Sequence, residues 1–201
     1  MKVLRLGVLT LLFCCGCSNW SSEPESAAPV VERIGDRFSR PWLLIESKSR
    51  RGTLFKADGT SSMLKELSFG SGGIDLKRRQ GDQVTPLGVF RVTAIRPSKK
   101  YGTFIEISYP TRRDADRGYK EGIIDARTWQ RIVKASREGR RPPMMTPLGG
   151  HIGIHGEPLG GPSLTGVLDY TNGWVGVSEA EMTVLEDVLK IGSVVHITEN
   201  P

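Results

Sequence analysis

The chain has 201 residues, of which 38% are hydrophobic and 25% are charged. This is ordinary globular composition with enough chain for one well-buried core, and the absence of a visible repeat period excludes a repeat architecture. The formal net charge is +6, and the 24 glycines favour turns and short strands over long helices.

The first 16 residues have the features of an export signal. Lys2 and Arg5 supply positive charge, and Leu6–Phe13 is nearly all apolar but shorter than the about 20 residues that span a bilayer. Gly16 followed by Cys17 resembles the end of a bacterial lipoprotein signal, where the acylated cysteine becomes the new N-terminus. We predict a lipoprotein exported to the bacterial envelope, anchored to a membrane and facing the periplasm. A plain secretory signal or a buried N-terminal helix is the alternative.

All three cysteines lie in this N-terminal segment, at positions 14, 15 and 17. Cleavage before Cys17 removes two of them, and acylation blocks the third. From Ser18 onward the sequence has no thiol. The mature protein is therefore expected to have no intrachain disulfide, no thiolate nucleophile and no cysteine metal site.

The rest of the chain divides into a spacer and one domain. Residues 17–40 are predicted to be the lipid-attached cysteine and a flexible spacer, because Ser, Glu, Ala and Pro predominate in 18–29. A single domain is predicted for residues 41–199. Apolar or alternating runs predict strands, with a hairpin turn at 57–59, in the segments 42–46, 53–55, 64–69, 88–95, 103–109 and 194–197.

Three helices are predicted between these strands from their capping residues. Thr111 and Asp114 have the spacing of a capping box and predict a helix over 112–120. Asp125 can cap a second helix, which Pro142 and the proline after it stop. Ser178 and the glutamate three positions on open a third, through about residue 190. Strands predominate, so we predict a mainly β domain.

Basic clusters lie at 77–79 and 137–141. In an exported protein, anionic wall polymers or lipid headgroups are better partners than nucleic acid, and we predict no nucleic-acid partner. For any single cluster, a solvated basic face is a better explanation than either partner.

Three stretches carry residues that chemistry could use. The first, 81–90 (GDQVTPLGVF), has a Thr-Pro-x-Gly turn before a strand. The second, 151–156 (HIGIHG), places His151 and His155 on one strand face by alternation. The third, 169–177 (DYTNGWVGV), runs into the helix that follows Ser178.

Together and in this order, the three stretches resemble the L,D-transpeptidase (YkuD) catalytic domain, over about residues 42–197. That family has a Thr-Pro-x-Gly turn, a His-Gly on a strand, and a Gly-Cys followed by apolar residues and a helix. The resemblance implies a mainly β fold, a β-sandwich with a few inserted short helices. Its members cross-link peptidoglycan with a cysteine thiolate, a histidine base and backbone N–H groups that stabilise the oxyanion.

Carried onto this sequence, the resemblance implies a catalytic site that lacks its nucleophile. His155 matches the base, Gly173 the oxyanion turn and Trp174 the position of the nucleophilic cysteine, while Asn172 stands where many members have a further histidine. An indole cannot act as an acyl-transfer nucleophile. Loss of the nucleophile removes about 10⁶-fold of catalysis, so thiol-dependent transpeptidation is not expected.

Two functions remain open at this stage. The first is a non-catalytic module that binds peptidoglycan or another envelope glycan, with Trp174 stacking on sugar or peptide and with His151 and Gly156 in the binding groove. The second is a repurposed transferase or hydrolase acting on peptidoglycan or a periplasmic glycan. There His155 would work with a carboxylate such as Asp169, or with a hydroxyl.

His155 could also be structural, with its ring satisfied by a backbone carbonyl. A metal site would need His151 and His155 to converge with Glu157 or His196. Because the sequence contains no recognised metal signature, we predict neither a metal nor another cofactor.

Overall fold

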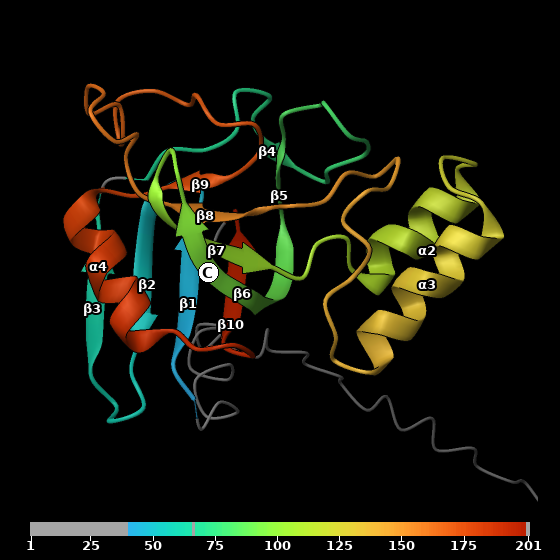
Figure 1. The fold of residues 1–201 in the computed structure, drawn as a ribbon, viewed down its shortest axis with the longest axis horizontal. Coiled ribbons are helices and arrows are strands. Elements are labelled where there is room, and N and C mark those ends of the chain that lie inside the picture. The colour runs from blue at the N-terminus through green and yellow to red at the C-terminus, as the bar shows by residue number, and fades with distance from the viewer. Residues whose placement is uncertain (1–39, 66, 200–201) are drawn as a thin grey trace, which may run out of the picture.

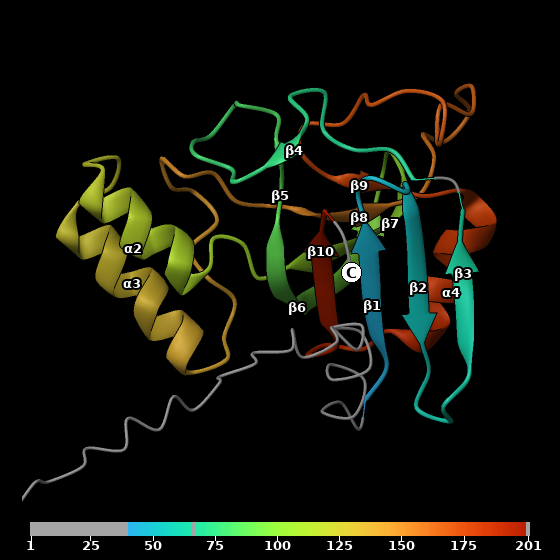
Figure 2. The same cartoon turned by 180° about the vertical axis from the view of Figure 1, so that it is seen from behind.

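The computed structural model describes residues 40–65 and 67–199, and Figures 1 and 2 show it from opposite sides. The predicted signal peptide, Cys17 and nearly all of the predicted spacer lie outside the described residues. In chain order, the described elements are β1 (Trp42–Glu46), β2 (Arg51–Phe55), β3 (Ser61–Leu64), β4 (Ile74–Asp75), β5 (Thr85–Pro86), β6 (Gly88–Ser98), β7 (Gly102–Ile107), α2 (Arg112–Lys120), α3 (Ala126–Arg137), β8 (Gly153–His155), β9 (Val175–Gly176), α4 (Glu179–Val188) and β10 (Val194–Thr198).

Eight of the strands form one sheet in the order β3-β2-β1-β10-β6-β7-β8-β9. The long strand β6 belongs to both halves of it, because its first residues pair with β10 and its later residues pair with β7. The register shifts between Val92 and Ala94, and such a bulge bends a strand and increases its twist. The sheet therefore curls, and β7 and β8 lie across β1 and β10 in both views (Figures 1 and 2).

The main core fills the inside of this curl. It combines residues of both halves of the sheet, such as Leu43, Leu54, Ile105 and Ile154, with the buried face of α4. Helix α4 lies on the same side of β1–β3 as β7–β9, which completes two layers (Figures 1 and 2). The predicted mainly β, sandwich-like fold with inserted helices is confirmed.

Helices α2 and α3 form a hairpin beside the sheet, with a small core of their own (Figure 1). Both begin as the sequence predicts. Thr111 and Asp114 form a reciprocal capping box at α2, and Asp125 accepts a hydrogen bond from the backbone N–H of Thr128 at α3. Local capping chemistry thus sets where the hairpin starts.

Two strand predictions differ from the structure. The strand predicted over 64–69 is not found in its described residues: Leu64 ends β3, and Ser68 and Gly70 make only isolated bridges. Leu67 and Phe69 are nevertheless buried, so their apolar character reflects burial in a loop. In 151–155 the strand begins at Gly153, because His151 has a left-handed backbone with φ of 54°.

Within the described residues, no helix has the length and apolar character that crossing a membrane requires.

Candidate functional site

The three stretches singled out in the sequence meet at the backbone of Trp174. Strand β8 pairs with β9, which sets His155 opposite Gly176. The hydroxyls of Thr85 and Thr171 both donate to the carbonyl of Trp174, over 3.3 Å and 2.6 Å. The oxygen of Thr85 in turn accepts from the N–H of Gly70, over 2.8 Å. The Thr-Pro-x-Gly turn thus fixes the backbone next to the histidine strand.

The residue before Trp174 has to be glycine. Gly173 has a φ of 101°, which side chains rarely tolerate, and a Cβ there would lie 2.6 Å from the carbonyl oxygen of Val84. A Cβ on Gly70 would in turn come within 2.8 Å of the Cα of Gly173. The segment that presents Trp174 is therefore held tightly between two loops.

His155 is buried and has only one of its ring nitrogens satisfied. Its Nδ1–H donates to the carbonyl of Gly156 over 2.7 Å, so Nε2 carries the lone pair. Nε2 is buried and has no hydrogen-bond partner in the structure. Burial lowers the pKa of His155 to about 4, and the charge of Lys100 adds to this while the Gly156 carbonyl opposes it. At neutral pH the ring is an uncharged base facing no proton donor.

Aromatic side chains enclose this imidazole. The ring centroid of Trp174 lies 5.4 Å from that of His155, with the planes at 83°, and Tyr101 packs at 4.0 Å. Phe104, opposite His155 on β7, contacts the indole edge-on at 5.4 Å. The closeness of His155 and Trp174 across 18 intervening residues was a prediction, and the structure confirms it. Trp174 is partly exposed.

A charged cluster continues the same face of the sheet. Glu106 is fully buried, and its carboxylate accepts from the guanidinium of Arg141 through Nε and, over 2.8 Å, through Nη2. The Nδ1 of His151 lies 3.2 Å from it, and Nη2 of Arg96 lies 3.9 Å away. Burial alone would raise the pKa of Glu106, but Arg141 and His151 outweigh it and lower that pKa. His151 thus occupies the polar end of the site, half exposed.

Residues 40–197 match the family described as YkuD, the L,D-transpeptidase catalytic domain. The chain belongs to this family. Among solved structures, it resembles Bd1075 of Bdellovibrio bacteriovorus with 18% identity and a TM-score of 0.50, over 82% of this chain and 50% of that one. It also resembles the helical cell shape determining protein Pgp2 of Campylobacter jejuni with 19% identity and a TM-score of 0.52, over 81% of this chain and 49% of that one.

The chain therefore spans about half the length of these two structures. At such identities the likeness shows a shared fold alone. A search of curated protein sequences finds no match.

The structure also places the other residues predicted for the L,D-transpeptidase-like site. Asp169 accepts two hydrogen bonds from Arg50, over 2.7 Å and 3.0 Å, and one from the N–H of Phe69. Gly156 is buried against α4, where a Cβ would meet Glu179 Oε2 at 2.9 Å. Asn172 is exposed. The structure thus joins His155, Gly173 and Trp174 but gives Asp169 a different partner.

No hydroxyl binds Nε2 of His155 within the described residues. The Thr171 hydroxyl donates to the carbonyl of Trp174, the Ser178 hydroxyl caps α4, and the Ser163 hydroxyl donates to Glu157. Nor are any three His, Cys, Asp or Glu side chains of the described chain placed to hold a metal ion.

The sequence did not reveal the residues that surround His155 and His151. Tyr101, Phe104, Glu106 and Arg96 were not singled out, although Phe104 and Glu106 alternate within a predicted strand. Alternation places two residues on the same face of a strand, but it does not say which neighbouring strand lies beside them.

Proposed function

We propose that this chain is a peptidoglycan-binding member of the L,D-transpeptidase family that does not carry out thiol-dependent transpeptidation. We further propose that a lipid on Cys17 holds it at the bacterial envelope, facing the periplasm. The observation that carries the proposal is the contact between the indole of Trp174 and the imidazole of His155.

The loss of thiol chemistry is supported by position and composition. Trp174 directly follows the left-handed Gly173 and lies beside the histidine, which are the relationships expected of the family's nucleophilic cysteine. After Cys17 the sequence contains no other cysteine to supply a thiolate. The indole nitrogen is not nucleophilic, because its lone pair belongs to the aromatic ring. A base without a nucleophile cannot start acyl transfer.

Ligand binding is supported by the surface around the indole. The partly exposed Trp174 packs edge-to-face on the buried Phe104, and the guanidinium of Arg96 lies 4.8 Å from the centre of the Phe104 ring. Aromatic faces suit the apolar faces of sugar rings, and guanidinium groups suit the carboxylates of stem peptides. A partly exposed indole with a guanidinium nearby therefore matches a polymer that combines glycan and acidic peptide.

The repurposed enzyme has less support. Such chemistry would need a carboxylate or hydroxyl beside Nε2 of His155, but Asp169 is held by Arg50 and Glu157 accepts from Ser163. These contacts favour the binding function.

Co-sedimentation with purified sacculi tests the proposal, using the full chain with Cys17→Ser so that its own lipid plays no part. We expect binding that falls about tenfold or more in Trp174→Ala. The matched control is Trp129→Ala, which removes an indole from α3 that bonds to Asp116, away from the site. Equal binding of both variants would contradict the proposed site.

The same incubations, analysed for muropeptides, test for catalysis. We expect no change in the cross-links. Turnover of a tetrapeptide donor by the wild type, abolished in His155→Ala, would overturn the non-catalytic assignment.

A further inference from the structure

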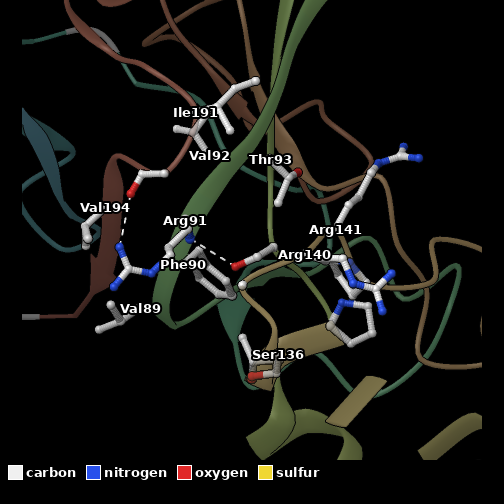
Figure 3. A pocket seen from close by; sticks show the side chains of 16 residues that line it. Val89, Phe90, Arg91, Val92, Thr93, Ser136, Arg140, Arg141, Ile191 and Val194 are labelled. Carbon is white, nitrogen blue, oxygen red and sulfur yellow. Dashed lines mark hydrogen bonds between the residues drawn. The ribbon is translucent and has the colours of Figure 1, made fainter. Parts of the chain in front are cut away.

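A cavity of about 620 Å³ lies away from the His155–Trp174 site, between β6, β10 and the C-terminal end of α3 (Figure 3). Among the described residues, Arg141 and Thr93 line the cavity and also contact the charged cluster, both through Glu106. The volume falls within the about 300–1,000 Å³ that is usual for small-molecule sites.

Much of the wall of this cavity is apolar. Val89 and Val194 come from β6 and β10, and Ile191 comes from the loop before β10. Phe90 and Val92 also line the cavity, but their side chains are buried in the main core. Val89 is 56% exposed and Ile191 is 66% exposed. Two large aliphatic side chains are thus left in contact with water at one cavity, at a cost that an apolar ligand would relieve.

Cations stand around the same cavity. Arg91 and Arg140 lie on opposite sides of it (Figure 3). Arg91 donates through Nη1 to the carbonyl of Gly192 over 3.1 Å, and Arg140 pairs with the exposed Glu138. Hydroxyl groups of Ser108 and Ser136 also line it, and no acidic residue is among the lining residues in the described part of the chain. The adjoining segment 111–141 has ten basic and five acidic residues, which adds to the positive potential.

We propose that this cavity binds an anionic amphiphile, a lipid-like molecule with one phosphate group. The phosphate would bind between Arg91 and Arg140, and the apolar chain would lie along Val89 and Ile191. An anion without an apolar chain would leave the apolar residues exposed to water. An uncharged chain would have no electrostatic attraction to the arginines. Phosphate suits the site better than a carboxylate, because its three peripheral oxygens accept from two guanidiniums and a hydroxyl together.

Titration calorimetry with a soluble probe tests this directly. The protein is the full chain with Cys17→Ser, and the probe is dihexanoylphosphatidic acid below its micellar concentration. Dihexanoylphosphatidylcholine has the same chains with a neutral headgroup, and inorganic phosphate has the charge without chains. We expect saturable binding of the first and at least about tenfold weaker binding of the other two.

Variants at exposed positions locate the site. Arg140→Gln and Ile191→Asp should each weaken binding about tenfold, one by removing the cation and the other by placing a charge at the apolar mouth. Glu138→Gln should strengthen binding, because it releases Arg140 from its ion pair. Arg113→Gln, an exposed arginine on α2 that does not line the cavity, is the matched control and should change nothing.

Three results would each overturn the proposal: no saturable binding of the phosphatidic acid, equal affinity for the phosphatidylcholine or for phosphate alone, or unchanged affinity in both Arg140→Gln and Ile191→Asp. Because no peptidoglycan is present, the outcome is independent of the function proposed for the Trp174 site.

Discussion

The indole of Trp174 stands edge-on to the imidazole of His155, with their ring centroids 5.4 Å apart. The Nδ1–H of the imidazole donates a hydrogen bond to the Gly156 carbonyl. The lone pair on Nε2 is buried and has no hydrogen-bond partner among the described residues. A histidine held in this tautomer turns a proton-accepting nitrogen toward the site, yet the residue beside it has no acidic proton to give. Replacing Trp174 is therefore the most direct test of whether His155 can act as a base at this position.

Trp174→Cys should create a reactive thiol. We expect its pKa to lie below the usual value of about 8.5, because His155 can accept the thiol proton once the indole is gone. The rate of reaction with a disulfide reagent, measured against pH, gives that pKa. A cysteine placed at Trp129 on α3 serves as the ordinary thiol for comparison, and it should react more slowly at neutral pH.

Adding His155→Gln to Trp174→Cys should bring the rate back to that of the Trp129→Cys protein. Removing the indole also leaves a cavity, which costs up to about 3–5 kcal/mol for a buried tryptophan and less for this partly exposed one. Trp174→Ser leaves a similar cavity without a thiol. Its free energy of unfolding therefore shows how much stability the missing indole costs, apart from any reactivity of the thiol. If Trp174→Cys reacts no faster than Trp129→Cys, His155 does not act as a base on that position.

Gly173→Ala should be more damaging than an alanine at another left-handed glycine. Gly173 and Gly59 both have positive φ, at 101° and 83°. A Cβ at Gly59 meets nothing within 4 Å, whereas one at Gly173 would lie 2.6 Å from the oxygen of Val84. We expect Gly59→Ala to cost about 1 kcal/mol and Gly173→Ala about 3 kcal/mol, since the second adds a clash to backbone strain. Urea unfolding measures the loss of unfolding free energy in both variants. Equal losses would mean that the loops around Gly173 can move to accommodate the added Cβ.

The helix starts could be predicted from the sequence because capping is local. Thr111 with Asp114, and Ser178 with Glu181, satisfy each other's backbone N–H groups across three positions, so the pattern is complete within one turn. The order of the three chemistry-bearing stretches likewise predicted that His155 and Trp174 meet, through the family resemblance.

The polar end of the site could not be found in the same way. Glu106 meets Arg141 and His151 across separations of 35 and 45 residues, and those contacts depend on the curl of the sheet at the bulge between Val92 and Ala94. No local signal specifies that bend. The segment 64–69 shows the opposite error: Leu67 and Phe69 are buried without a strand, because burial of apolar side chains does not require a ladder of hydrogen bonds.

Cys17→Ser should release the protein from membranes. If the thiol of Cys17 is acylated, its loss removes both the site of lipid attachment and the buried hydrocarbon that holds the chain at the bilayer. Labelling with a radioactive fatty acid, followed by fractionation, should show label and membrane association in the wild type and neither in the variant. Ser18→Ala is the matched control and should be labelled normally. An unlabelled wild-type protein that is still processed would indicate a plain secretory signal.

The stability of the domain should depend on the protonation of His155. In the folded protein burial lowers its pKa to about 4, whereas in the unfolded chain it is about 6.5. Between these values the unfolded chain binds a proton that the folded protein does not, so acid favours unfolding. The contribution of His155 to the free energy of unfolding should therefore be complete above about pH 6.5. It should be lost progressively down to about pH 4, by an amount on the order of 3 kcal/mol.

His155→Gln removes this titration, so the difference in unfolding free energy between wild type and variant should shrink steadily as the pH falls through that window. Burial also lowers the pKa of His196, and His196→Gln separates its slope, which has the same sign. Asp82 and Asp169 have lowered pKa values, so their contributions are lost mainly at lower pH and are common to all three proteins. Urea unfolding at half-unit steps from pH 4 to pH 8 makes the comparison. A constant difference between wild type and His155→Gln would mean that the ring is protonated as easily in the folded protein as in the unfolded chain, which a buried neutral imidazole does not allow.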